Sequence, residues 1–300
     1  VACGLGTAVY DPTTATIILN NAVIETAYNG IGISKQGAYD ATNKLIIELV
    51  GVNKITTNEI NRIHTGIYSM GISIKGAGSL LIETAVDSDS HVPAGIHAWS
   101  GCNITESRIT VKNTSSYQGS FSSAIDVNKF DASLQIINAI ISIDNYIVGI
   151  NVPSGDVTVQ DSRITVTNAD CGISGGNEID NFIIQGSVLD FTGEGVSSIG
   201  LLNGRDIQID SSLVKIISQN SNAVYTDGAI TIRNGSSLEM RAFYPALFST
   251  LDTTITDSAV IAISTDDSGI YSRANILING TSDILARGHW AGINANGNIT

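Results

Sequence analysis

Three aromatic residues occupy one repeated position in this sequence and could bind a sugar. Tyr225, Phe248 and Tyr271 recur at equal spacing, each after a small residue and an aliphatic one. On a β-strand, the aliphatic side chain would point to one face and the ring to the other. Stacked strands lie about 4.7–4.9 Å apart, so the rings would form an exposed strip that can receive the apolar face of a sugar. The alternative is aromatic stacking that stiffens the sheet.

The same position carries mostly polar side chains in the other repeats. These residues are Tyr68, His97, Asp126, Asn151, Ser174, Gly200 and Asn294. The histidines of the chain occupy unrelated places in the repeat, so we expect surface hydrogen bonding from each. We find no cluster with a catalytic signature and predict no catalytic residue.

Four acidic residues are candidates for a calcium site. Asp87 and Asp89 lie in a long loop, and Asp266 and Asp267 are adjacent. Calcium prefers several converging oxygen ligands, which carboxylates supply. A solvated acidic loop is the competing interpretation, because the spacing matches no known calcium loop. Asp266 and Asp267 could also be the paired carboxylates of a glycosidase, although neighbouring strand residues point to opposite faces.

Composition excludes several classes of partner. The net charge is −13, with only 15 Lys and Arg residues, so the clustered basic residues that bind nucleic acid are absent. No run of apolar residues is long enough to predict a transmembrane helix. The three cysteines, Cys3, Cys102 and Cys171, show neither a disulfide framework nor zinc-ligand spacing, and we expect buried free thiols.

A repeat of about 25 residues organises the chain. Residues 102–111 and 157–166 show it best, since both end in Ser-Arg-Ile-Thr-Val. Each unit has two short strands, a variable loop and a third short strand, and one such unit cannot bury a core alone. Stacking about eleven units joins like strand to like strand. The sequence therefore predicts an all-β fold, a right-handed parallel β-helix (solenoid) of about eleven coils with three short strands per coil.

The repeat indicates one domain. No linker interrupts it, so we expect a single β-helix domain over residues 1–300, regular from about residue 16. Residues 1–15 are expected to form an incomplete first coil. The segment between the second and third strands varies most in length, and loops of this kind usually carry function.

Two phrases of the repeat carry a resemblance. Residues 66–74 (GIYSMGISI) and 269–278 (GIYSRANILI) share a small residue, Ile, Tyr and Ser before a strand, and residues 16–24 (TIILNNAVI) form an opening strand pair. In these features the chain resembles the clostridial-type carbohydrate-binding β-helix family of the pectate-lyase-like superfamily. The resemblance implies a non-catalytic, secreted or surface-held bacterial protein that binds plant cell-wall polysaccharide, including acidic pectin, with bound Ca²⁺.

Three functions remain open from the sequence. The first is an extracellular or cell-surface polysaccharide-binding protein without catalytic activity, which takes a plant cell-wall or pectin-like glycan, assisted by calcium. The second is a polysaccharide lyase or glycoside hydrolase of the pectate-lyase-like superfamily, although the signatures of pectate lyases and polygalacturonases are missing. The third is a structural surface adhesin, in which Tyr225, Phe248 and Tyr271 stabilise the fold and bind nothing.

Overall fold

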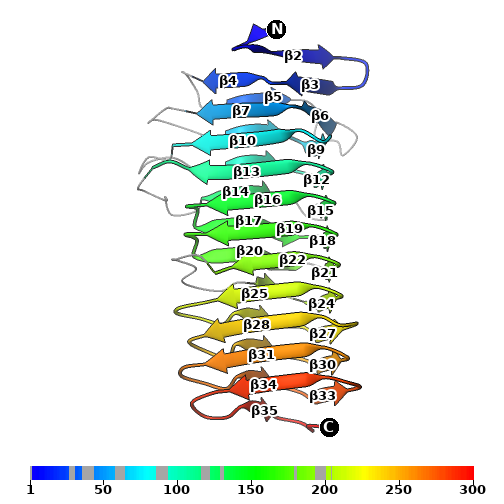
Figure 1. The fold of residues 1–300 in the computed structure, drawn as a ribbon, viewed down its shortest axis with the longest axis vertical. Coiled ribbons are helices and arrows are strands. Elements are labelled where there is room, and N and C mark those ends of the chain that lie inside the picture. Colours follow the sequence, from blue (N-terminus) through cyan, green and yellow to red (C-terminus); the bar gives the residue numbers. More distant parts are fainter. Residues whose placement is uncertain are drawn as a thin grey trace. The chain divides into compact units, whose positions relative to one another are not determined.

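The computed structural model describes residues 2–26, 31–35, 44–57, 65–85, 94–115, 122–128, 132–178, 181–192, 201–203 and 205–300. The chain divides into two compact units, Val1–Val152 (unit 1) and Pro153–Thr300 (unit 2). Within each unit, short strands pair in parallel and build three sheets (Figure 1). The predicted right-handed parallel β-helix is confirmed. In the described part of the chain, no helix is long and apolar enough to cross a membrane.

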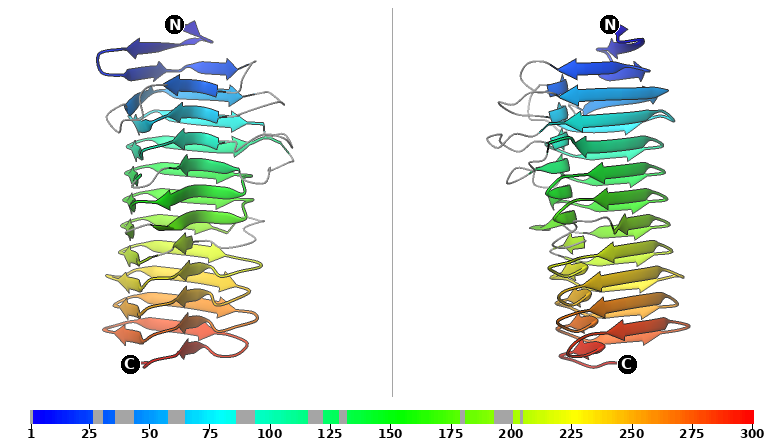
Figure 2. Two further views of the ribbon diagram at one scale, coloured as in Figure 1. Left: turned by 180° about the vertical axis from the view of Figure 1, so that it is seen from behind. Right: turned by 60° about the vertical axis from the view of Figure 1, so that its left-hand side comes forward.

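We name the sheets by the order of their strands within a coil. Sheet A collects the first strands, sheet B the second strands and sheet C the third strands. Figure 2 shows the stacking within each unit from behind and from the side.

In unit 1, sheet A consists of β1 (Ala2–Cys3), β2 (Gly6–Asp11), β3 (Thr16–Asn20), β6 (Lys44–Val50), β9 (Gly71–Lys75), β12 (Cys102–Thr105) and β15 (Leu134–Ile137). Sheet B consists of β4 (Val23–Thr26), β7 (Val52–Thr57), β10 (Ser79–Thr84), β13 (Arg108–Asn113) and β16 (Ile140–Asp144). Sheet C consists of β5 (Ile31–Lys35), β8 (Thr65–Ser69), β11 (Ala94–Ala98), β14 (Ser123–Val127) and β17 (Val148–Ser154), whose last two residues belong to unit 2.

In unit 2, sheet A consists of β18 (Val157–Gln160), β21 (Phe182–Gln185), β24 (Ile207–Asp210), β27 (Ile230–Arg233), β30 (Thr253–Thr256) and β33 (Ile276–Asn279). Sheet B consists of β19 (Arg163–Thr167), β22 (Val188–Phe191), β25 (Leu213–Ile217), β28 (Ser237–Ala242), β31 (Ala259–Ser264) and β34 (Asp283–Arg287). Sheet C consists of β20 (Cys171–Glu178), β23 (Leu201–Asn203), β26 (Val224–Thr226), β29 (Leu247–Ser249), β32 (Ile270–Ser272) and β35 (Ile293–Ala295).

The N-terminal segment differs from the incomplete coil that we expected. β2 turns back and pairs antiparallel with β3, with Thr7 opposite Asn20, and β1 pairs antiparallel with β2. A hairpin therefore covers the edge of β3 in place of a coil. Parallel coil-to-coil pairing begins where predicted, with Thr16 of β3 opposite Ile46 of β6.

The core consists of aliphatic ladders, because each strand turns alternate side chains inward. Ile209, Ile232 and Ile255 lie opposite one another on neighbouring strands and are fully buried. Steric crowding explains why many third strands begin with a small residue. A Cβ atom on Gly66 would lie 2.4 Å from Ile82, and one on Gly95 would lie 2.1 Å from Val111. Sheets B and C thus approach too closely there for any side chain.

Candidate functional site

The three aromatic residues predicted to form a row lie next to one another in unit 2. In sheet C, Tyr225 is opposite Phe248, and Phe248 is opposite Tyr271. The Tyr225 and Phe248 rings stack, with centroids 4.9 Å apart and planes 3° apart. The Tyr271 ring stands edge-on to Phe248, at 5.4 Å and 74°. The row thus has the predicted register, but its third ring is turned.

The row is not the evenly exposed strip that we expected. Phe248 is only 7% exposed, whereas Tyr225 and Tyr271 are half-buried. The exposed Arg273 lies over the middle ring, with its guanidinium carbon 5.3 Å from the Phe248 centroid, a cation–π distance. Phe248 therefore supports the row, and the surface offered to a ligand consists of two tyrosines and a cation.

Polar groups fix the edges of this row. The Tyr225 hydroxyl donates to Oδ1 of Asp227 at 2.8 Å, and the Tyr271 hydroxyl donates to Oδ1 of Asn296 at 3.3 Å. Partial burial, and then the hydrogen bond to Asp227, raise the pKa of Tyr225 above its usual value, so the hydroxyl stays a donor at neutral pH. The aromatic faces can pack against the apolar face of a sugar, and the carboxylate, amide and guanidinium groups at their edges can bind its polar groups.

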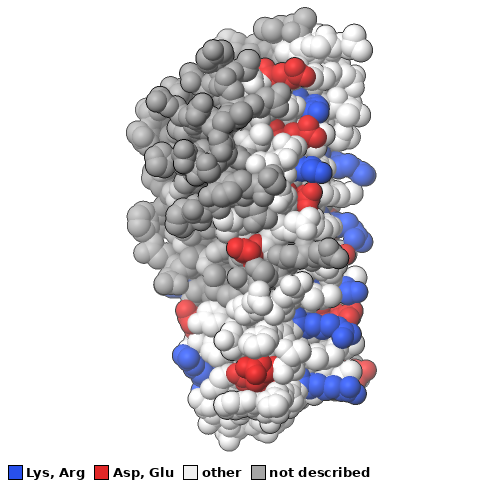
Figure 3. Space-filling view, turned by 90° about the vertical axis from the view of Figure 1, so that its left-hand side faces the viewer, with Lys and Arg blue, Asp and Glu red and all other residues white. Residues whose placement is uncertain are grey.

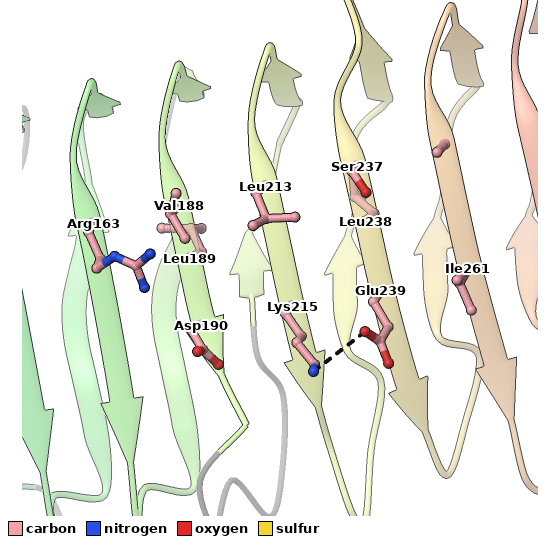
Figure 4. A pocket seen from close by; sticks show the side chains of 11 residues that line it. Arg163, Val188, Leu189, Asp190, Leu213, Lys215, Ser237, Leu238, Glu239 and Ile261 are labelled. Atoms are coloured by element: carbon pink, nitrogen blue, oxygen red, sulfur yellow. Dashed lines mark ion pairs between the residues drawn. The ribbon is translucent and has the colours of Figure 1, made fainter.

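A shallow groove of about 360 Å³ lies on the outer face of sheet B in unit 2 (Figure 4). Four charged side chains line it from β19, β22, β25 and β28. They are Arg163, Asp190, Lys215 and Glu239. Apolar side chains complete the wall, among them Leu213, which is 48% exposed, and Ile261, which is 37% exposed. The groove crosses successive strands, so an elongated ligand could follow it.

Charges of opposite sign alternate in the middle of this groove. Asp190, Lys215 and Glu239 face one another on neighbouring strands. The Lys215 ammonium lies 3.5 Å from Glu239, and Arg241 contacts the same carboxylate at 3.6 Å. Such exposed pairs contribute little stability. Figure 3 shows this face in profile along its right-hand edge, where basic and acidic side chains gather.

The predicted calcium ligands are not brought together in the described part of the chain. Asp87 and Asp89 lie outside the described residues. Asp266 and Asp267 occupy a bend after β31, where the Asp266 backbone amide donates to the Phe243 carbonyl. Oδ1 of Asp267 accepts from the Ser268 backbone amide at 2.6 Å. Among the residues described, no three His, Cys, Asp or Glu side chains are grouped to hold a metal.

Sequence reasoning missed the groove on sheet B. Arg163, Asp190, Lys215 and Glu239 belong to different coils and share no local motif. Each occupies an outward position of its strand. The alignment of the second strands places Asp190, Lys215 and Glu239 in one row, but outward charged residues alone do not indicate a groove. Comparisons of this chain with protein-family models and with curated protein sequences find no match.

Proposed function

We propose that this chain is a polysaccharide-binding protein without catalytic activity, and that sheet C of unit 2 contacts the glycan. The observation that supports this most is the row of Tyr225, Phe248 and Tyr271 in register on three strands, bordered by Asp227 and Asn296. A polymer with a repeating apolar face matches a surface that repeats from coil to coil.

Arg273 indicates which glycans would bind best. Its guanidinium lies above Phe248, between the two half-buried tyrosines, where a carboxylate of a uronic-acid polymer could pair with it. The resemblance described above extends the proposal to pectin-like plant cell-wall glycans and to an extracellular or cell-surface location. Calcium-assisted binding remains part of the proposal, with a carboxylate of the glycan supplying ligands that the chain lacks in its described part.

Retention by immobilised polysaccharides tests this function. Polygalacturonate, xylan and glucomannan gels would be compared by affinity electrophoresis, with and without calcium. The double variant Tyr225→Ala/Tyr271→Ala removes two ring contacts with the glycan, each worth about 0.5–1.5 kcal/mol. Its affinity should therefore fall about tenfold or more, since about 1.4 kcal/mol corresponds to a factor of ten. If Arg273→Gln loses affinity for polygalacturonate alone, the acidic glycan is the one that Arg273 contacts.

A matched control lies in the same unit. Phe243 and Tyr244 form another aromatic pair, 5.1 Å apart and edge-to-face, and both are well exposed. Phe243→Ala/Tyr244→Ala should leave retention unchanged. Equal effects of both double variants, or no retention by any gel, would refute the proposal. A stability loss in Tyr225→Ala/Tyr271→Ala with unchanged retention would favour the structural adhesin.

The groove on sheet B gives the enzymatic alternative one specific observation. Asp190 and Glu239 lie on the two strands on either side of the Lys215 strand. Their backbones are therefore two strand spacings apart, or about 9.5 Å. Inverting glycosidases place two carboxyl groups about 6.5–9.5 Å apart. A hydrolase should release reducing ends from these polysaccharides, and Asp190→Asn and Glu239→Gln should each abolish that release.

A further inference from the structure

The outer face of sheet C in unit 1 buries a network of polar and aromatic side chains. Tyr68, His97, Asp126 and Asn151 lie in register on β8, β11, β14 and β17. His97 and Asp126 are only 9% and 1% exposed, which corrects the surface role expected for this histidine. Outward positions of a β-helix usually face water, and a carboxylate loses much solvation free energy on burial. The network therefore needs an explanation.

Asp126 lies in close contact with the imidazole of His97. Nδ1 of His97 lies 2.8 Å from Oδ2 of Asp126, and Asn151 donates to Oδ1 of the same carboxylate at 2.8 Å. Apart from the His97 contact, Oδ2 has no partner among the described residues. Because the Asp126 carboxylate lies beside Nδ1, Nε2 is the ring nitrogen turned away from it. No described residue contacts Nε2 by hydrogen bond or ion pair.

Two aromatic side chains surround the His97 ring. The Tyr68 ring stacks on His97, with centroids 5.4 Å apart and planes 3° apart, and Trp99 stands edge-on to His97 at 5.3 Å. Nε1 of Trp99 donates to the Tyr68 hydroxyl at 2.8 Å, so that hydroxyl keeps its own proton for another acceptor. Tyr68, Trp99 and Asn151 are half-buried, which leaves part of each accessible.

We propose that Tyr68, His97, Trp99, Asp126 and Asn151 form a second sugar site, which takes a neutral hexose residue. A sugar hydroxyl forms a hydrogen bond with Nε2 of His97, the Tyr68 hydroxyl donates to a neighbouring sugar oxygen, and the pyranose face packs against Trp99. The site selects a neutral ring because the buried carboxylate of Asp126 repels a uronate, and in the described structure this carboxylate pairs with no Lys or Arg. The row in unit 2, by contrast, has Arg273.

This inference rests on the proposed polysaccharide ligand, and the two tryptophans of the chain allow a separate test. Trp99 lies in the site, whereas Trp290 is 77% exposed in unit 2. In the variant Trp290→Phe, the only tryptophan emission comes from Trp99. Titration with cellohexaose, mannohexaose and galactohexaose should give a saturable change with at least one of them, and hexagalacturonate should give none.

Two substitutions test the assigned contacts in that background. His97→Phe keeps an aromatic ring, removes Nε2 and should weaken the apparent affinity about tenfold or more. Tyr68→Phe keeps the stacked ring, loses only the hydroxyl, and should weaken it several-fold even if His97→Phe fails to fold. The reciprocal variant Trp99→Phe, which emits from Trp290 alone, should show no response to the same sugars.

Three results would overturn the inference. They are no Trp99 response to any of the three neutral hexasaccharides, an equal response to hexagalacturonate, and unchanged affinity in Tyr68→Phe. Tyr225→Ala/Tyr271→Ala should leave the Trp99 response intact. Failure of the unit 1 site with normal gel retention, and loss of gel retention with a normal Trp99 response, are therefore distinguishable results.

Discussion

Cys102 and Cys171 are small core residues whose thiols are shielded from solvent. Both are buried and unpaired, and burial raises the pKa of each thiol to about 12. Because the thiolate is the reactive form, neither should react with an aromatic disulfide reagent in the folded protein at about pH 8. Cys3 is half-buried and should react.

Thiol counting checks this prediction. One thiol per chain should react in buffer and three in concentrated guanidinium. The same pKa shift predicts a pH dependence of stability. Because the folded pKa exceeds the ordinary thiol value of 9.0, the contribution of these thiols to the unfolding free energy is complete below about pH 9 and is lost as the pH rises toward 12. Fast reaction of two or three thiols in buffer would contradict the buried positions.

Tyr146 is a buried residue that the repeat pattern did not identify as core. It is fully buried in unit 1, and its hydroxyl lies 2.6 Å from the hydroxyl of Thr84, which is also fully buried. Burial raises the pKa of Tyr146 well above its usual range, so the pair stays uncharged. Tyr146→Phe leaves the Thr84 hydroxyl unpaired and should cost about 1–3 kcal/mol of unfolding free energy.

A double-mutant cycle isolates this hydrogen bond. Thr84→Val removes the partner with little change in shape, and Tyr146→Phe/Thr84→Val should cost clearly less than the sum of the two single variants. Denaturant unfolding followed by circular dichroism gives the free energies. Strictly additive effects would mean that the two hydroxyls do not interact.

The turn between sheets A and B is the element that varies least along the chain. In most turns one residue adopts a left-handed conformation, as in Asp161 (φ 49°), Ser211 (φ 50°) and Asp257 (φ 49°). Asn, Asp and Gly tolerate this region best, which accounts for their frequency there. The constant length of this turn could be predicted from the sequence. Its conformation required the backbone.

Serines that follow these turns in unit 2 form a ladder. The hydroxyl of Ser212 accepts from the backbone amide of Ser187 at 3.1 Å and donates to the carbonyl of Asp210 at 2.7 Å. Ser187 and Ser236 make equivalent bonds to their neighbours. Ser212→Ala would leave the buried amide of Ser187 without this acceptor and should cost about 1–3 kcal/mol.

A more exposed serine pair at the same position of later turns supplies a matched control. Ser282 is half-buried, and the amide of Ser258 donates to its hydroxyl at 3.5 Å. Ser282→Ala should therefore cost less than Ser212→Ala, because water can replace the lost acceptor. Unfolding midpoints in urea compare the two variants. Equal losses would show that the ladder does not act through buried amides.

Sequence reasoning succeeded where one local rule repeats in every coil. The small residue, the inward aliphatic residue and the outward residue were assigned correctly in most third strands, and so the Tyr225–Phe248–Tyr271 register was predicted. The assignment was wrong in two coils, where Ile33 pairs with Ile67 and where Leu202, in place of Gly200, lies opposite Tyr225. It failed where a side chain responds to a neighbour in another coil. The cover of Arg273 over Phe248 and the burial of His97 against Asp126 depend on packing between coils, which no local pattern encodes.

The same distinction applies to the whole molecule. The parallel β-helix follows from the periodicity, because only stacking buries the aliphatic face of each coil. The N-terminal hairpin does not follow from it, since β2 has no counterpart in the repeat and pairs antiparallel with β3. Function is the property least determined by the fold, because the same scaffold can present either a binding row or a catalytic groove.

The net charge of −13 decides how the molecule should respond to salt when it binds an acidic glycan. Polygalacturonate is a polyanion, so long-range repulsion opposes its approach even if Arg273 makes a local ion pair. Raising the ionic strength from about 0.01 M to about 0.1 M shortens the screening length from about 30 Å to about 10 Å. Affinity for polygalacturonate should therefore rise over this range, and affinity for neutral xylan or glucomannan should stay constant.

Calcium provides a second, separable effect on the same binding. At constant ionic strength, calcium should increase polygalacturonate retention if the ion bridges glycan and protein carboxylates, and a chelator should reverse the increase. Magnesium is the control, because it screens charge equally but dehydrates reluctantly. If both cations increase retention equally, calcium acts only by screening the net charge of −13. A fall in affinity with added sodium chloride would instead mean that the local contact with Arg273 outweighs the net charge of the chain.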